Sequence, residues 1–111
     1  MKIPSEFQIG AFTYKVVMKR KLSKTGTCWG RSYLGPRVIH LAKRNGNRAL
    51  TKAEITSTFW HEYAHCMLYQ MGHPLWKDEA FCDMFGESVE QTLRTAKFKD
   101  CLLYTSDAAD E

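Results

Sequence analysis

The chain has 111 residues, of which 16 are Lys or Arg and 12 are Asp or Glu, so its formal net charge is +4. This length allows one small domain with a single core, and no stretch approaches the roughly 20 apolar residues of a membrane span. The first residues lack the apolar segment of a signal peptide. The four cysteines form no C-x-x-C pair, which favours a reducing cytoplasm over a disulfide scaffold; they are Cys28, Cys66, Cys82 and Cys101.

Three strands are predicted in the first half of the chain. Apolar residues alternate between Phe7 and Met18, which indicates a half-buried strand. A hairpin turn is expected from Lys19 to Thr27, because it contains Ser23 and Gly26. Cys28 to Tyr33 and Arg37 to Ala42 are the other two strands, separated by Gly35-Pro36. His40 is expected to be a strand residue beside the cleft.

Two helices are predicted in the second half. Thr51 and Glu54 have the spacing of a capping box, which opens a helix that should run to about Met71. Gly72-His73-Pro74 ends it, and Asp78 can cap a second helix that reaches about Lys97. We therefore expect an α+β domain in which a small three-stranded antiparallel sheet is followed by two packed helices.

The first helix contains the pattern H-E-x-x-H, formed by His61, Glu62 and His65. Two histidines at positions i and i+4 lie on the same helix face, so both imidazoles can reach one metal ion. Glu62 lies at the rim of this site, where a carboxylate can accept a proton from the attacking water. The alternative is a pair of surface histidines on a polar helix face.

The second helix supplies a third candidate ligand. Glu79 and Asp83 are also spaced i and i+4, and Gly86 continues their face. A helical glycine costs stability, so a close approach of another backbone would explain Gly86. The opposite face is expected to be core; it carries Phe81, Met84, Phe85, Val89 and Leu93. The alternative for Glu79 and Asp83 is a solvated acidic helix face.

Residues 51–95 resemble the gluzincins, the thermolysin-like branch of the H-E-x-x-H zinc metallopeptidases. The resemblance implies that His61, His65 and Glu79 bind one Zn²⁺ ion, that Glu62 is the catalytic base, and that Asp83 orients His61 through its distal ring nitrogen. It also implies that the strand before the motif helix, here Arg37 to Ala42, lies at the sheet edge and pairs with an extended peptide substrate.

Only thirteen residues separate His65 from Glu79. This short connection resembles the compact minigluzincins, including the ImmA/IrrE-like metallopeptidases of mobile elements, and implies a phage or prophage protein acting in the cytoplasm of a bacterial host. The larger enzymes bind the oxyanion with a further helical domain, for which this chain has no room. A metzincin pattern fails, because Leu68 and Met71 stand where Gly and the third His would be. His73 is expected to be a loop residue rather than a ligand.

Two functions remain open. The first is a zinc-dependent peptidase with a peptide or protein substrate. The second is a non-catalytic metal-binding interaction module that contacts a repressor or a nucleic acid; Glu62 argues against it, because a structural site has no use for that carboxylate. Basic residues gather between Lys15 and Lys24 and between Arg37 and Arg48. Nucleic-acid binding is nonetheless not favoured, because no helix-turn-helix, zinc ribbon or aromatic-interleaved motif accompanies them.

The last eleven residues, 101–111, resemble the translation of a sequencing adapter. We therefore expect residues 1–100 to form the minimal zincin-like domain and exclude the tail from fold reasoning. Without the tail the chain has 16 basic and 9 acidic side chains, because Asp107, Asp110 and Glu111 are removed from the 12 acidic ones.

Overall fold

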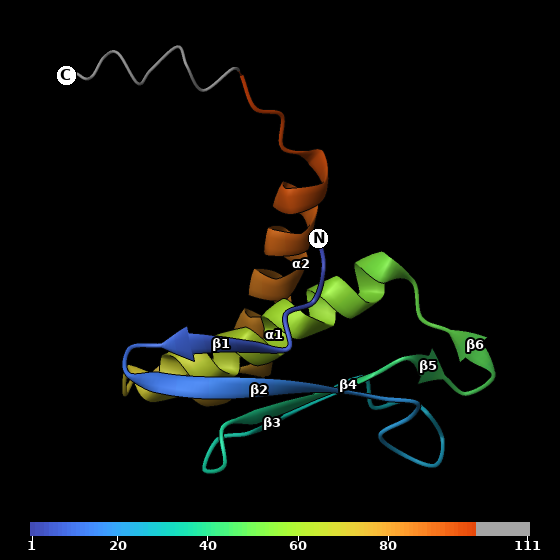
Figure 1. The fold of residues 1–111 in the computed structure, drawn as a ribbon, viewed down its shortest axis with the longest axis horizontal. Helices are drawn as coiled ribbons and strands as arrows, with labels where there is room; N and C mark the ends of the chain where they lie inside the picture. The colour runs from blue at the N-terminus through green and yellow to red at the C-terminus, as the bar shows by residue number, and fades with distance from the viewer. Residues whose placement is uncertain (100–111) are drawn as a thin grey trace.

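The structure, a computed structural model, describes residues 1–99, and the predicted adapter-derived tail lies outside them. The domain is α+β, as predicted, with a sheet followed by two long helices (Figure 1). In chain order the elements are β1 (Glu6–Ile9), β2 (Phe12–Lys19), β3 (Gly30–Tyr33), β4 (Val38–Ala42), β5 (Arg44–Asn45), β6 (Arg48–Ala49), α1 (Lys52–Gln70), the 3₁₀ helix η1 (Pro74–Lys77) and α2 (Glu79–Thr95). No helix in this part of the chain combines the length and the apolar character that crossing a membrane requires.

The prediction of three antiparallel strands is wrong, because the sheet has four strands and is mixed. The strand order is β1-β2-β4-β3, with β2 and β4 parallel and the other two pairs antiparallel. The predicted strand from Phe7 to Met18 is a hairpin, since the chain turns at Gly10, whose φ of 61° suits glycine. This turn adds the fourth strand.

The parallel pair follows from the long connection after β2. A tight turn would have placed β3 next to β2, as the sequence suggested. Instead the chain runs through residues 20–29, forms β3 and returns as β4 beside β2. The register places Val16 opposite Ile39 and Met18 opposite Leu41. Consequently β3, and not β4, occupies the outer position in the sheet.

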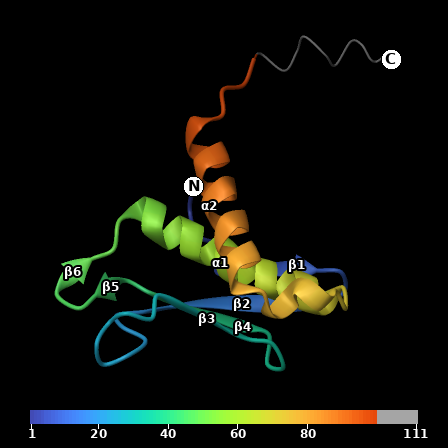
Figure 2. The same cartoon turned by 180° about the vertical axis from the view of Figure 1, so that it is seen from behind.

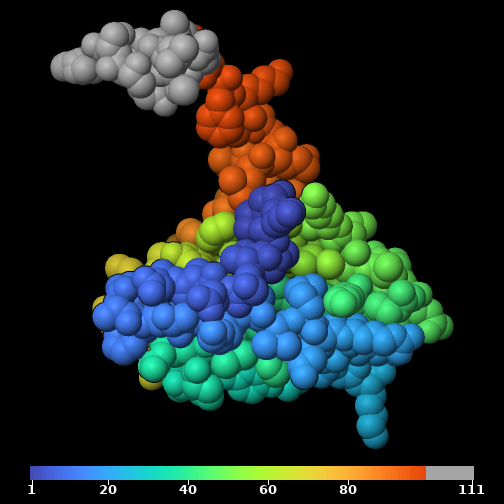
Figure 3. Space-filling view, viewed as in Figure 1, coloured from blue at the N-terminus to red at the C-terminus, as the bar shows by residue number. Residues whose placement is uncertain are grey.

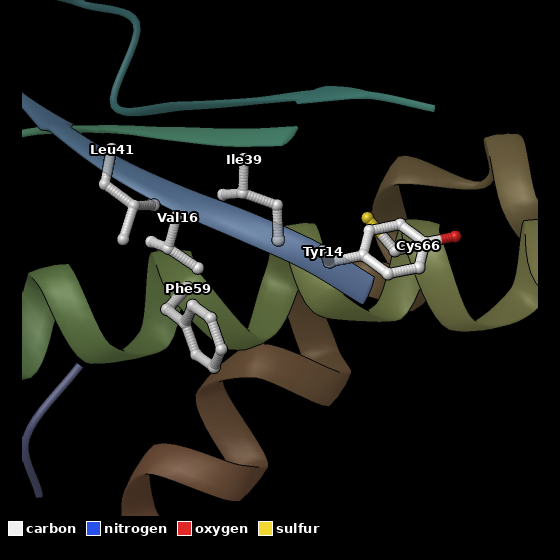
Figure 4. Close-up of a cluster of buried hydrophobic side chains, with 6 residues drawn as sticks. All are labelled: Tyr14, Val16, Ile39, Leu41, Phe59 and Cys66. Atoms are coloured by element: carbon white, nitrogen blue, oxygen red, sulfur yellow. The ribbon is translucent and has the colours of Figure 1, made fainter. Parts of the chain in front are cut away.

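One face of the sheet packs on α1 and forms the main core. Tyr14 and Val16 of β2 and Ile39 and Leu41 of β4 point at α1, which contributes Phe59 and Cys66 (Figure 4). The alternation predicted for β2 is thus confirmed at its centre. The Tyr14 hydroxyl donates a hydrogen bond of 2.6 Å to the Gln70 side chain near the end of α1. The Tyr14 side chain is thus held by core packing and by this hydrogen bond. This core fixes α1 across the sheet.

Both predicted helix starts are confirmed. Thr51 accepts a hydrogen bond from the Glu54 main chain at 3.1 Å, and Glu54 accepts one from the Thr51 main chain at 2.8 Å, which completes the capping box. Asp78 caps α2 by accepting from the Phe81 main chain at 2.8 Å. The two helices cross, and α2 then rises away from the body (Figure 2). The helix starts and the crossing of the helices determine where the predicted metal ligands His61, His65 and Glu79 lie.

The prediction that the apolar face of α2 is core is wrong for most of its length. Met84 is 69% exposed and Leu93 48%, whereas the buried residues of α2 are Cys82 and Gly86. Small residues face α1 because the two backbones approach closely there. The far half of α2 projects from the body and shows its sides to solvent (Figure 3). Cys66 and Cys82 are both fully buried.

Candidate metal centre

The structure brings His61, His65 and Glu79 together at the crossing of α1 and α2. The two Nε2 atoms of the histidines lie 3.1 Å apart. Oε1 of Glu79 lies 3.0 Å from Nε2 of His61 and 3.3 Å from Nε2 of His65. The three ligand atoms therefore face one point, and the group can hold a metal ion.

Hydrogen bonds made by the Nδ1 atoms of the two histidines explain why their Nε2 atoms face this point. Nδ1 of His61 donates to Asp83 at 2.7 Å, and Nδ1 of His65 donates to the main-chain carbonyl of Trp76 at 2.6 Å. A neutral imidazole carries one N–H, so each Nε2 presents a lone pair to the centre. With Oε1 of Glu79 as the third, electron-rich atoms about 3 Å apart repel each other unless a cation lies between them.

The spacing of these atoms suits a small tetrahedral ion. Bonds of about 2.0–2.2 Å in a tetrahedron place neighbouring ligand atoms about 3.3–3.6 Å apart, so a slight outward adjustment of the observed atoms is enough. The histidine side chains are 15% and 11% exposed, but that of Glu79 is 73% exposed. The site is thus closed on the α1 side and open to solvent on the α2 side.

Glu62 lies beside this group without joining it. Its side chain is 9% exposed, and its Oε2 lies 3.8 Å from Nε2 of His61. Its Oε1 accepts a hydrogen bond of 2.6 Å from the hydroxyl of Ser32 in β3. Burial raises the pKa of the Glu62 carboxyl above its usual value, although the Ser32 hydrogen bond and the nearby histidines act to lower it. A carboxylate with raised pKa accepts a proton more readily near neutral pH.

Sequence reasoning missed the two residues of β3 that hold Glu62. Ser32 bonds to both its carboxylate and its main-chain carbonyl, the latter at 3.2 Å. Gly30 allows β3 to lie close to α1, because a Cβ at this position would lie 2.7 Å from the Thr58 side chain and 3.0 Å from Cγ of Glu62. A glycine and a serine two positions apart share one strand face, but only the pairing of β3 with β4 places that face against α1.

Gly86 sets the distance between the helices. A Cβ at this position would lie 2.4 Å from the Ser57 carbonyl oxygen and 2.8 Å from the main-chain nitrogen of His61. The predicted close approach of another backbone is therefore confirmed, and that backbone belongs to the turn that carries His61. Since Glu79 and Asp83 lie on the same face of α2, this contact fixes their reach toward the histidines.

A cleft crosses the site along β3. One hollow of about 320 Å³ lies toward η1 and is lined by residues such as Ser32, Leu34 and Trp76. A second of about 310 Å³ lies toward the loop before β3 and is lined by residues such as Cys28, Trp29 and Thr58. Both include Gly30, Glu62 and Glu79, so the group of ligand atoms sits where the two hollows meet.

The strand beside the cleft is not the one expected. The resemblance implied that Arg37 to Ala42 lies at the sheet edge, but β4 is paired on both sides. Within residues 1–99, β3 pairs only with β4 and leaves its other edge open. His40 is a strand residue of β4, but it does not line the cleft hollows; it packs against the Tyr33 ring instead. His73 lies in the turn after α1, as expected, and its side chain caps η1.

Comparison with known proteins gives no match: no protein-family model, no curated protein and no solved structure is significantly similar to this chain. The gluzincin resemblance therefore stays a prediction, carried by the motifs on α1 and α2.

Proposed function

We propose that this chain is a metal-dependent peptidase of the compact gluzincin type, acting in the cytoplasm of a bacterial host. The observation that carries the proposal is the position of Glu62. A buried carboxylate lies next to three convergent ligand atoms, is held by a hydrogen bond on one oxygen, and keeps the other oxygen on the side of the cleft. A purely structural metal site gains nothing from such a group.

The metal that fits this set of ligands best is Zn²⁺. Two imidazoles and one carboxylate, with an open fourth position, are typical of catalytic zinc. When bound, zinc supplies a Lewis acid that polarises the peptide carbonyl and makes water more acidic. His61 and His65 would hold it from α1 and Glu79 from α2. Asp83 and the Trp76 carbonyl keep the two imidazole rings oriented and their Nδ1 atoms protonated.

Glu62 performs the proton transfers in this proposal. Its Oε1 is occupied by the Ser32 hydroxyl, so Oε2 is the atom that accepts the proton of the attacking water. The oxygen of that water adds to the peptide carbonyl carbon. The same carboxyl then returns the proton to the amide nitrogen as the C–N bond breaks, which leaves Glu62 ionised for the next cycle. Burial of Glu62 excludes bulk water that would compete for this proton.

The free edge of β3 is the proposed place for the substrate main chain. An extended peptide that pairs with this edge would lie along the cleft. Its residues before and after the scissile bond would then occupy the two hollows, with a carbonyl near Glu62. Main-chain pairing binds many sequences, and the side chains lining the hollows provide selectivity.

The test compares Glu62→Gln with Glu87→Gln, the same change at an exposed position on α2. Both variants should keep the fold and bind one zinc ion. With unstructured polypeptides such as casein as substrates, Glu62→Gln should lower the rate at least about 100-fold, as expected for loss of a general base. Glu87→Gln should leave it unchanged. Equal cleavage by both variants would exclude Glu62 as the base.

The same experiment separates the enzyme from the non-catalytic interaction module. A zinc-loaded wild-type protein that cleaves none of the polypeptides, while Glu62→Gln still binds zinc normally, would favour the module.

A further inference from the structure

The four-stranded sheet has a second face, which no described helix covers. Residues of β2, β3 and β4 alternate between the α1 side and this outer face. Strand pairing arranges the outer residues in rows: Lys15, Val38 and Tyr33 form one, and Val17, His40 and Arg31 form the next. Lys19 extends the face beyond them, beside the buried Ala42.

This outer face is basic, because Lys15, Lys19 and Arg31 lie on it. From residue 7 to residue 53 the chain has eleven Lys or Arg and no Asp or Glu. Among residues 1–99, Glu6 in β1 is the carboxylate that pairs with a cation of these rows, at 2.6 Å from Lys15. Burial is the largest cause of the lowered pKa of His40, and the nearby cations Lys19 and Arg31 lower it further. The two cations therefore act on the centre of the face, and an anion bound there would meet little repulsion.

Aromatic rings lie among these cations. The Tyr33 and His40 rings pack edge to face with centroids 4.9 Å apart, and Tyr33 remains 39% exposed. They are seven residues apart in the sequence and belong to neighbouring strands, so no local motif reveals them. The basic residues therefore do have aromatic partners, and these are brought to them by strand pairing.

We propose that this outer face binds single-stranded nucleic acid, with the phosphates on Lys15, Lys19 and Arg31 and a base stacked on Tyr33. Cations that follow a backbone, together with an exposed aromatic ring on an open sheet, are the combination used for unpaired strands. A duplex keeps its bases stacked inside and could not use Tyr33. An anionic membrane would need a broad apolar face, whereas these rows expose two large side chains of apolar character, Val17 at 37% and Tyr33 at 39%.

The proposed face lies on the other side of the sheet from the metal centre, and the inference does not rest on peptidase activity. In β3, Gly30 and Ser32 face α1 and Glu62, whereas Arg31 and Tyr33 alternate with them. Arg31 also borders the hollow toward η1, but Lys15, Lys19 and Tyr33 line neither hollow of the cleft. Binding can therefore be measured with the metal site filled or empty.

The experiment measures binding of fluorescein-labelled 20-nucleotide DNA and RNA strands by anisotropy, beside a DNA duplex, poly-glutamate and anionic lipid vesicles. Single strands should bind in the micromolar range at low salt, and three cations predict a slope of log affinity against log salt of about −2. Comparison of the two affinities shows whether the face prefers DNA or RNA.

Two pairs of variants assign the binding to this face. Tyr33→Ala should weaken single-strand binding about 5- to 100-fold, and Tyr33→Phe should keep it, because stacking needs the ring alone. Lys19→Gln should weaken binding and make the salt slope smaller by about 0.7. Lys97→Gln makes the same charge change beyond the end of α2 and should have no effect. Circular dichroism and thermal melting verify that each variant is folded.

Several results would overturn the proposal. They are absence of single-strand binding at about 100 µM protein and low salt, unchanged binding by Tyr33→Ala, and equal losses for Lys19→Gln and Lys97→Gln. Tighter binding of the duplex, of poly-glutamate or of the vesicles than of single strands would assign the face to that other partner.

Discussion

Replacing Gly86 by Ala should move the metal ligands apart. The added Cβ would lie 2.4 Å from the Ser57 carbonyl oxygen, whereas ordinary contact begins at 3.4 Å, so α1 and α2 must separate locally by about 1 Å. Overpacking of this kind costs about 1–3 kcal/mol. Alanine returns about 1 kcal/mol through its helix propensity. The net loss of unfolding free energy is then between about zero and 2 kcal/mol.

The effect on metal binding should be larger than the effect on stability. Oε1 of Glu79 now lies 3.0 and 3.3 Å from the two imidazole nitrogens. A 1 Å separation exceeds the roughly 0.2 Å tolerance of a metal site, so zinc affinity should fall at least about tenfold. Competition with a chromophoric chelator measures the affinity, and thermal melting of the metal-free protein measures the stability.

Gly35→Ala is the matched control, because a Cβ at Gly35 meets no atom within 4 Å and its backbone is not in the left-handed region. If Gly86→Ala binds zinc as tightly as the wild type and melts at a higher temperature, helix propensity has dominated. The inference that this contact spaces the two helices would then be refuted.

Two further predictions concern single carboxylates. Asp83→Ala should weaken zinc affinity about 10- to 100-fold, because His61 loses the acceptor of its Nδ1 hydrogen. Asp83→Asn, which keeps an acceptor oxygen, is the control. Unchanged zinc affinity in Asp83→Ala would contradict this role of Asp83. Hydrogen bonds from Arg48 and then from the Thr51 main chain lower the pKa of Glu54 to about 2. Because the folded-state pKa is depressed, Glu54 stabilises the fold above pH 4.5, and this contribution is lost as the pH falls toward 2. In denaturant titrations the stability difference between wild type and Glu54→Gln should therefore shrink over that range; a constant difference would contradict the assignment.

The grouping of the three candidate metal ligands could be predicted from the sequence because their geometry is local. The i, i+4 spacings of His61 with His65 and of Glu79 with Asp83 define faces of single helices. The short connection between the helices leaves them few ways to pack. The capping residues Thr51 and Asp78 were equally readable, since a cap involves neighbours three positions apart.

The sheet could not be predicted in the same way, because its pairing is not local. Gly10 and Ala11 separate β1 from β2. Apolar residues alternate on both sides of this turn but shift from odd to even positions across it, and the predicted single strand overlooked that shift. Nothing in the composition of residues 20–29 distinguishes a hairpin from a crossover, so the parallel pairing of β2 with β4 was missed. Ser32 was missed for the same reason, as it meets Glu62 across thirty positions. The Trp76 carbonyl that orients His65 belongs to the main chain, and residue identity carries no signal for it.

The parallel pairing of β2 with β4 also bears on the order in which the site is assembled. His61, His65 and Glu79 all belong to the segment 61–79, so the two helices alone bring the ligands together. Ser32 arrives with β3, and only after the β1-β2 hairpin and the β3-β4 hairpin have joined across a long loop, which is the slow type of contact in folding. Metal capture can thus precede completion of the sheet. A newly made chain of the proposed peptidase would hold its ion before Glu62 is in place, and the proposed hydrolysis would begin only once the domain is whole.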